Sequence, residues 1–214
     1  MPEPVSDHYH HGNLREALID AALELARTGG ENALTLRDAT RQVGVSASAA
    51  YRHFSDRDAL ATAVSERIRD AMAERMSAFE PDAATGRDRL RAVGLGYIAF
   101  AREEPGWFET AFATITALPA ASTAAASAPP TPLPSPLIAL TAALDALVVD
   151  GDLSAEDRIG AEWPCWSAVH GFARLWLRGP LRQLPEATVQ SAAERTVDTA
   201  IAGLLALAGP VPVR

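Results

Sequence analysis

Gly44 lies between two segments with the residue pattern of short helices, which are so close in the sequence that only a tight turn can join them. Thr35 can cap the first helix and Ser46 the second, and Gly44 suits the left-handed backbone that ends a helix. One face of the first helix has the i, i+3, i+4, i+7 spacing of buried positions, at Leu36, Ala39, Thr40 and Val43. Two short helices joined in this way predict a helix-turn-helix.

The second helix has a first turn of small residues and then becomes aromatic and basic. Ala50 and Phe54, four residues apart, are expected to face inward. The opposite face carries small side chains that let the backbone approach the base edges of DNA, next to Tyr51 and Arg52. A helical hairpin in any all-α protein would have the same pattern, so the pattern alone leaves DNA binding open.

Five segments follow one another in a characteristic order: His10-His11-Gly12-Asn13-Leu14-Arg15-Glu16-Ala17-Leu18, Leu34-Thr35-Leu36-Arg37, Gly44-Val45-Ser46, Tyr51-Arg52-His53-Phe54 and Asp56-Arg57-Asp58-Ala59-Leu60. Together they closely resemble the DNA-binding domain of TetR/AcrR-type transcriptional regulators. Several segments in the right order are far more specific than one motif. The resemblance covers about a quarter of the chain and implies DNA binding.

The resemblance also implies which positions contact DNA. Tyr51 and His53 match positions that bind phosphate, Ala47 and Ser48 match positions that face bases, and Arg37 matches one that reaches the groove or the backbone. A basic residue at the start of the following helix touches a phosphate in such proteins, and Arg57 occupies that place. The expected DNA interface is Thr35, Arg37, Ser46, Ala47, Ser48, Ala49, Tyr51, Arg52, His53 and Arg57.

The net charge of -8 argues at first against binding to nucleic acid, but the local charge of the DNA-binding segment matters more than the net charge of the whole chain. Between positions 35 and 57 the chain has four arginines and only two acids, a local excess that a dimer would double. These residues are Arg37, Arg41, Arg52 and Arg57, against Asp38 and Asp56.

The remaining sequence reads as helices, with no convincing β alternation, so the chain is expected to be all-α with about nine helices. We expect an arm and a three-helix DNA-binding domain at 1–56 and a helical effector-binding and dimerisation domain at 57–214. A poorly ordered loop is expected at 118–135, where the chain is rich in Ala, Ser and Pro. After the helix-turn-helix, a long helix capped by Ser55 or Asp56 is predicted to run to about Phe79. Further helices are predicted from Thr85 to Glu103, Pro105 to about Thr116, Pro136 to Val149, Ser154 to Arg178 and Pro185 to Leu207.

Other classes of protein are disfavoured. Nothing resembles a signal peptide or a membrane span, and a lone Cys165 excludes an intrachain disulfide, so a cytoplasmic protein without a membrane partner is expected. Cys165 and His170 are five apart and diverge on a helix, so an enzyme is not expected. No cofactor or metal is expected, because His8, His10 and His11 stand on an end without a ligand framework.

Most aromatic residues lie in the expected second domain, at 57–214. They are predicted to line an apolar pocket, with ordinary core as the alternative. On one helix Trp166 and His170 share a face, and Arg174 follows at the same spacing, which suits an acidic or hydrogen-bonding ligand. The segment Trp166-Ser167-Ala168-Val169-His170-Gly171 resembles the Trp-His-Gly (WHG) type of C-terminal domain among TetR-like regulators. The expected pocket residues are Tyr97, Phe100, Trp107, Phe108, Phe112, Trp163, Trp166 and His170.

The last predicted helix has an apolar stripe that is too wide for one surface helix, so part of it is expected to pack across a two-fold axis, at Val197, Ile201 and Leu204. The resemblance implies that the final two helices form a four-helix dimer interface. The expected function is therefore a homodimeric, ligand-responsive repressor that binds a palindromic operator and is released by a small molecule. The alternative is a DNA-binding regulator that activates, or that answers to a protein partner.

Overall fold

The computed structural model describes residues 14–79, 81, 84–112 and 135–208, and every regular element within them is helical. The all-α prediction is therefore confirmed. None of the described helices is both long and apolar enough to cross a membrane. The α-helices are α1 (Leu14–Gly29), α2 (Leu36–Val43), α3 (Ala47–Ala50), α4 (Arg57–Ser77), α5 (Gly86–Glu103), α6 (Pro105–Ala111), α7 (Ser135–Val149), α8 (Glu162–Arg178) and α9 (Glu186–Leu207), with short 3-10 turns at Glu31–Ala33 and Pro180–Gln183.

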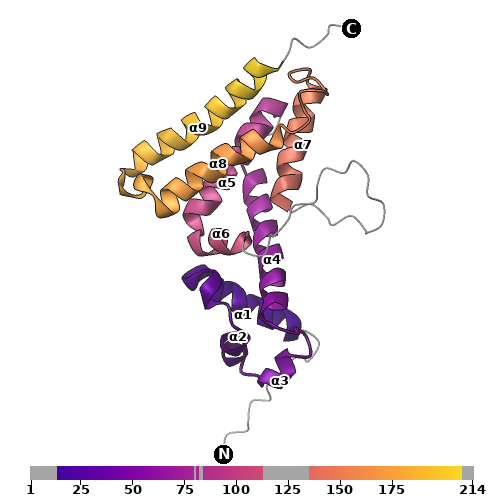
Figure 1. Ribbon diagram of the computed structural model, residues 1–214, viewed down its shortest axis with the longest axis vertical. Coiled ribbons are helices and arrows are strands. Elements are labelled where there is room, and N and C mark those ends of the chain that lie inside the picture. Colours follow the sequence, from indigo (N-terminus) through magenta and orange to yellow (C-terminus); the bar gives the residue numbers. More distant parts are fainter. Residues whose placement is uncertain (1–13, 80, 82–83, 113–134, 209–214) are drawn as a thin grey trace, which may run out of the picture.

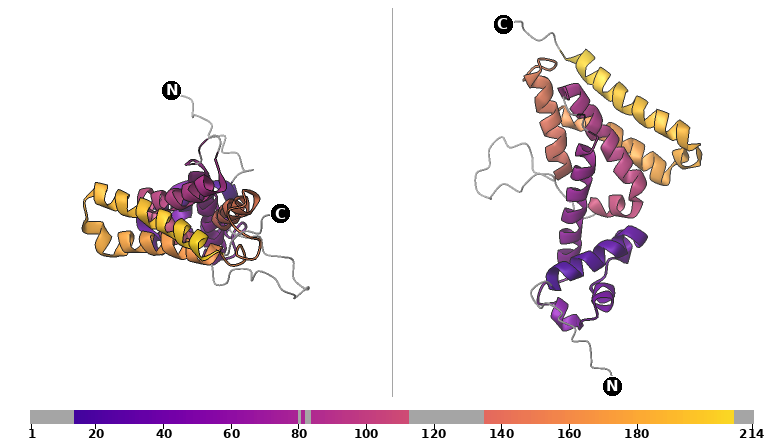
Figure 2. Two further views of the ribbon diagram at one scale, coloured as in Figure 1. Left: turned by 90° about the horizontal axis from the view of Figure 1, so that it is seen from above. Right: turned by 180° about the vertical axis from the view of Figure 1, so that it is seen from behind.

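Helix α4 connects the two ends of the molecule. Figure 1 shows α1, α2 and α3 gathered at one end and α4 running from there into a body made of α5 to α9. Asp56 caps α4, because its carboxylate accepts the N–H of Ala59 at 2.8 Å. Figure 2 shows α8 and α9 side by side on the outside of the body. The predicted long connecting helix is confirmed.

Three of the predicted helix starts coincide with a Thr or Ser side-chain cap. Thr35 Oγ1 accepts the N–H of Asp38 at 3.0 Å, and Ser46 Oγ accepts the N–H of Ala49 at 3.3 Å. Thr85 forms a capping box with Asp88. Each cap satisfies a backbone donor that the first turn leaves without an intrahelical partner, so the local sequence alone fixes these starts.

The predicted start of the helix at Ser154 is wrong, because α8 begins at Glu162. Ser154 Oγ does accept the N–H of Asp157 at 3.0 Å, but it caps a run of turns and not a continuous helix. Gly160 has φ of 81°, a left-handed conformation that interrupts any helix from Ser154 to Arg178.

Several predictions fall wholly or partly outside the described residues. These are the N-terminal arm, the histidines at 8, 10 and 11, the end of the helix predicted to Thr116, and positions 118–134 of the predicted loop. Within the described part, α6 ends at Ala111, and Ser135, the last residue of that loop, is the first residue of α7.

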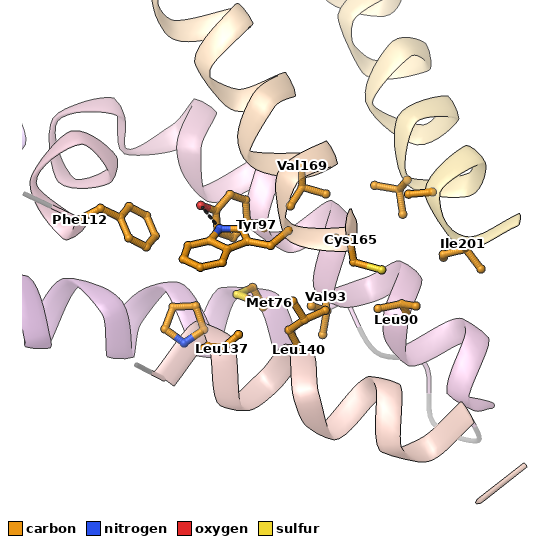
Figure 3. Close-up of a pocket in the computed structure, with 15 residues that line it drawn as sticks. Met76, Leu90, Val93, Tyr97, Phe112, Leu137, Leu140, Cys165, Val169 and Ile201 are labelled. Atoms are coloured by element: carbon orange, nitrogen blue, oxygen red, sulfur yellow. Dashed lines mark hydrogen bonds between the residues drawn. The ribbon is translucent and has the colours of Figure 1, made fainter. Parts of the chain in front are cut away.

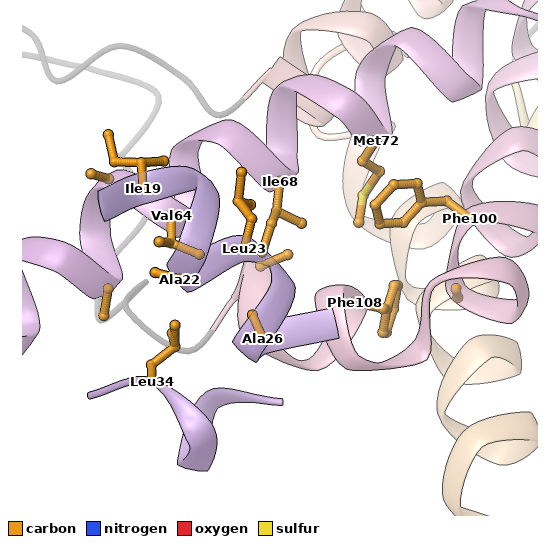
Figure 4. Packing of buried hydrophobic residues seen from close by; sticks show 14 of the residues in the cluster. Ile19, Ala22, Leu23, Ala26, Leu34, Val64, Ile68, Met72, Phe100 and Phe108 are labelled. Carbon is orange, nitrogen blue, oxygen red and sulfur yellow. The ribbon is translucent and has the colours of Figure 1, made fainter. Parts of the chain in front are cut away.

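One hydrophobic core runs from the helix-turn-helix into the body. Ile19 and Leu23 of α1 pack with Val64 and Ile68 of α4, as Figure 4 shows. The same cluster continues through Met72 to Phe100 and Phe108. Because this core crosses position 56, α4 packs both on α1 and on the helices of the body. The division into 1–56 and 57–214 stays a prediction.

Candidate DNA interface and central cavity

The helix-turn-helix has the geometry that its sequence predicts. Gly44 ends α2 with φ of 77° and ψ of 29°, and a β-carbon there would meet no atom within 4 Å. The backbone conformation, and not crowding, therefore favours glycine at this position. Ala50 and Phe54 are buried as expected. They anchor α3 and the turn after it against α1 and α2.

The opposite face of α3 is open to solvent. Ala47 and Ser48 are exposed, as are Arg52 and His53, and Tyr51 leaves 58% of its surface exposed. Arg37 on α2 is exposed as well. An exposed face of small residues, with aromatic and basic side chains at its end, suits the approach of a major groove.

The arginines near this face differ in what they contact. Arg41 pairs with Asp38 at 2.8 Å. Among the described residues, neither Arg37 nor Arg52 forms an ion pair. Guanidinium groups without a protein partner remain available for phosphates or for guanine edges. Arg37 and Arg52 are therefore the cations best placed for DNA in this part of the chain.

Three predicted DNA contacts have structural roles in the structure. Ala49 is only 9% exposed, so it offers little surface to a ligand. Thr35 and Ser46 use their hydroxyl oxygens as helix caps. These two hydroxyls fix where α2 and α3 begin.

Arg57 binds protein carbonyls. Its Nε donates to the carbonyl of Leu34 at 2.9 Å and its Nη2 donates to the carbonyl of Glu31 at 2.8 Å. These bonds tie the start of α4 to the turn that precedes α2. Arg57 thus positions the helix-turn-helix, which differs from the phosphate contact that the resemblance implies.

A narrow cavity lies in the middle of the body, between five helices (Figure 3). The centre of a water-sized sphere can move through about 40 Å³ of it, enough for a few water molecules. Among the described residues, no charged side chain lines this space. The lining is Met76 of α4, Leu90, Val93, Gly94 and Tyr97 of α5, Phe112 after α6, Pro136, Leu137 and Leu140 of α7, Cys165, Trp166 and Val169 of α8, and Val197, Ala200 and Ile201 of α9.

The polar atoms at the cavity satisfy one another. The indole N–H of Trp166 donates to the Tyr97 hydroxyl oxygen at 3.1 Å, and that hydroxyl lies 2.8 Å from Nδ1 of His170. Burial, and to a smaller degree the charge of Arg174, lowers the pKa of His170. Burial raises the pKa of Tyr97, and it raises that of Cys165 to about 11. All three groups are therefore neutral at physiological pH.

The structure divides the predicted pocket residues into lining and core. Tyr97, Phe112 and Trp166 line the cavity, and His170 lies behind Tyr97. Phe100, Trp107 and Phe108 do not line it. Phe100 and Phe108 are buried, and Trp107 is partly buried against the same core, where its N–H donates to the Leu23 carbonyl at 2.8 Å.

Two residues of α8 also face away from the cavity. Trp163 is 49% exposed and stacks on Trp166, with 6.1 Å between the ring centroids. Arg174 is exposed to solvent. The cavity thus has no positive side chain for the acidic ligand that the spacing on this helix suggested. The aliphatic lining from α7 was not predicted, since Leu137 and Leu140 have no sequence signal that separates them from ordinary core.

The three predicted dimer residues face the interior of their own protomer. Val197 is buried and packs on Gly94, where a β-carbon would lie 3.0 Å from both of its methyl groups. Ile201 lines the cavity, and Leu204 packs against the cluster around α7. The stripe on α9 is wide because it contacts both α5 and α8.

Helix α6 docks closely on the end of α1. A β-carbon at Gly106 would lie 2.3 Å from the carbonyl oxygen of Arg27, so only glycine allows this approach. The Arg27 guanidinium donates to both carboxylate oxygens of Glu104, at 2.8 and 2.9 Å, and lies 4.2 Å from the ring centre of Trp107. Because Phe112 directly follows α6, the cavity and the end of α1 are linked by one short helix.

Family models match both halves of the chain. The model described as bacterial regulatory proteins, tetR family, matches residues 18–64, which contain the helix-turn-helix. The model described as tetracyclin repressor-like, C-terminal domain, matches residues 90–200, which is 111 of 214 residues. The WHG type of C-terminal domain stays a prediction.

Solved structures share the fold over nearly the whole chain. A protein of unknown function from Rhodococcus sp. RHA1 is 26% identical, with a TM-score of 0.68 over 93% of this chain and 99% of that one. A TetR regulator from Streptomyces coelicolor is 19% identical, with a TM-score of 0.68 over 92% and 99%. A TetR variant from Acinetobacter baumannii AYE, solved in complex with minocycline, is 19% identical, with a TM-score of 0.63 over 94% and 97%.

Curated relatives include the nucleoid occlusion factors SlmA. The protein from Vibrio campbellii is 32% identical and that from Photobacterium profundum 33% identical, each over 95 residues. The match covers 44% of this chain, and the chain spans about half the length of these relatives. With the C-terminal model matching more than half of the sequence and the N-terminal model matching the helix-turn-helix, the chain belongs to the TetR family and is a DNA-binding transcriptional regulator.

Proposed function

We propose that this protein is a homodimeric repressor that leaves a palindromic operator when an uncharged, largely apolar small molecule enters the central cavity. The observation that carries the proposal is the position of the cavity. Met76 of α4 lines it, and the same helix holds α1 through Val64 and Ile68. A change in the cavity therefore bears directly on the helix that places the DNA-binding end.

The chemistry of the lining selects the ligand. A charged group brought into the cavity would lose its hydration and would find no counter-ion in the lining, which costs several kcal/mol in an apolar site. Tyr97 is the polar group at the wall, and its hydroxyl is already bonded to Trp166 and His170. An apolar molecule with at most one hydrogen-bonding group fits this environment best.

The narrowness of the cavity supports a coupling to DNA binding. A molecule of several heavy atoms exceeds the space present, so the helices that line the cavity must separate to admit it. Two of the affected elements also contact α1: α4, and α6, which Phe112 directly follows. Ligand binding then favours a second arrangement of the DNA-binding end, by the difference in its affinity for the two arrangements.

A dimer is proposed through the outer face of α8 and α9. A row of exposed residues spaced by four runs along α8, at Trp163, Ser167, Gly171 and Leu175. Small residues in the middle of such a row allow close approach of a partner helix. Two-fold symmetry then presents two copies of α3 to two half-sites, which is the physical basis of a palindromic operator.

A second candidate function is a regulator that activates or that answers to a protein partner. It is favoured by the similarity to nucleoid occlusion factors, at 32% identity over 95 residues. Under this reading the aromatic body would be core and a protein-binding surface, and small molecules would leave the complex with DNA unchanged.

The experiment is an electrophoretic mobility shift with DNA that flanks the gene of this protein, repeated with a panel of uncharged apolar compounds. We expect a specific complex that is weakened by Arg37→Ala, is unchanged by Arg182→Ala and is released by one class of compound. A specific complex that no compound releases favours the second candidate. Binding that Arg37→Ala leaves unchanged contradicts the placement of the DNA face.

A further inference from the structure

Arg102 of α5 binds a carboxylate, as other arginines of the body do, but it leaves one of its buried donors without a partner. Its Nη2 donates to Glu186 and its Nη1 donates to the side-chain oxygen of Gln190 at 2.9 Å. Its Nε is buried and has no hydrogen-bond partner, and it is the one side-chain nitrogen or oxygen of this kind in the described part of the chain. A buried donor without an acceptor costs free energy that natural proteins rarely leave uncompensated.

Other arginines show what this edge of the guanidinium normally binds. In five of them Nε and Nη2 both donate to the two oxygens of a single carboxylate, at Arg27, Arg75, Arg87, Arg91 and Arg178. This paired geometry is the strongest mode of binding between a guanidinium and a carboxylate. At Arg102 only Nη2 of this edge donates to a carboxylate, and Nε has no acceptor.

The ion pair between Glu186 and Arg102 is expected to contribute little to stability. Glu186 is 76% exposed, whereas Arg102 is only 15% exposed. An exposed carboxylate on a flexible stem loses side-chain entropy when it pairs and contributes little net free energy. A carboxylate from solution can therefore replace it without leaving Arg102 uncompensated.

Arg102 opens into a groove that is separate from the central cavity. The centre of a water-sized sphere can move through about 440 Å³ of it, compared with about 40 Å³ in the cavity, and the two spaces share no lining residue. Its lining combines two aromatic rings with aliphatic and charged side chains. The lining is Arg75 and Phe79 of α4, Leu95, Ile98, Ala99, Arg102 and Glu103 of α5, Trp176 of α8, and Glu186, Gln190 and Ala193 of α9.

We propose that this groove binds small aromatic monocarboxylates, with the carboxylate on the Nε and Nη2 edge of Arg102 in place of Glu186. The bound carboxylate satisfies the buried Nε and keeps a negative charge beside the first turn of α9, where the helix dipole favours it. The ring packs against the apolar side chains of the lining, which include Phe79 and Trp176. The site takes an acid, whereas the central cavity takes an uncharged molecule.

The test is calorimetric titration of the full chain with 2-naphthoate, and with uncharged 2-naphthamide as the matched probe. Saturable binding of 2-naphthoate and none of 2-naphthamide is expected. Glu186→Gln removes the competing carboxylate and is expected to tighten binding about two- to fivefold. Arg102→Gln is expected to weaken it by more than about tenfold. Arg91→Gln, which breaks a similar pair between α5 and α9, is the control and is expected to have no effect.

The gain in Glu186→Gln keeps the proposal testable if Arg102→Gln fails to fold, since a damaged protein does not bind more tightly. Absence of binding to both the wild type and Glu186→Gln at millimolar 2-naphthoate would overturn the proposal. Equal binding of 2-naphthamide, or 2-naphthoate binding that Arg102→Gln leaves unchanged, would also overturn it and place the probe elsewhere.

Discussion

Arg52 and Arg57 lie five positions apart and have different surroundings. The side chain of Arg52 is exposed and forms no ion pair within the described residues. Arg57 donates to two carbonyls in the segment between α1 and α2. Both are arginines near the second helix of the helix-turn-helix, so the sequence alone does not show that one is exposed to solvent and the other holds the start of α4.

Arg57→Leu is predicted to lower the free energy of unfolding by about 1–2 kcal/mol, because it removes two hydrogen bonds and leaves the Leu34 carbonyl without its donor, while the Glu31 carbonyl keeps the Leu34 N–H. Arg52→Ala is predicted to weaken DNA binding while stability stays unchanged. Thermal unfolding and anisotropy of labelled operator DNA measure the two effects. Equal stability of Arg57→Leu and the wild type would refute the positioning role.

His170 gives a pH dependence that can be isolated. Burial holds its pKa low in the folded chain, so the unfolded chain takes up a proton first as pH falls. The free energy of unfolding therefore drops as pH is lowered through about 6.5, the ordinary histidine value. His170→Gln removes this contribution, so its melting temperature is predicted to fall less than that of the wild type between about pH 7.5 and 5.5. Equal falls in both proteins would contradict the prediction.

At the level of elements, local signals predicted most helix starts and missed one. Thr35, Ser46 and Asp56 cap helices where the sequence places them, because a cap depends on residues three apart. Ser154 makes the same bond with Asp157, but the left-handed Gly160 ends the pattern before α8 begins. A cap in the sequence fixes the first turn and says nothing about how long the helix continues.

The central cavity was less predictable than the helix-turn-helix. The concentration of aromatic residues in the second domain pointed to Tyr97, Phe112 and Trp166, but it also pointed to Phe100 and Phe108, which are buried core. Leu, Val and Met recur at the same helical spacing whether their side chains line a cavity or pack in a solid core. The difference depends on how five helices pack against each other, which no single segment encodes.

Adding a methyl group at Gly106 is expected to disturb the contact between α6 and α1. Gly106→Ala places a β-carbon 2.3 Å from the Arg27 carbonyl oxygen, so α6 must move away from α1. A loss of about 1–3 kcal/mol in stability is expected, together with weaker operator binding. Gly203→Ala is the control, since its β-carbon meets nothing within 4 Å. Equal behaviour of both variants in thermal unfolding would show that this docking carries no strain.

At the scale of the whole molecule, dimerisation is tested best by a residue that the protomer does not need. A β-carbon at Gly171 meets no atom within 4 Å, so Gly171→Glu leaves the protomer intact. If the outer face of α8 forms the proposed interface, the new charge is buried against its symmetry mate and the variant sediments as a monomer with weak operator binding. A Gly171→Glu protein that sediments as a stable dimer would exclude this face.

The proposed coupling between the cavity and the DNA-binding end must act in both directions, because coupling between two binding sites is reciprocal. The most direct measurement is the affinity of the protein for a releasing compound, followed by tryptophan fluorescence with and without saturating operator DNA, with Trp166→Phe identifying the signal from the cavity wall. Weaker compound binding is expected in the presence of operator, by the same factor by which the compound weakens operator binding. Equal affinities in both conditions would contradict the coupling.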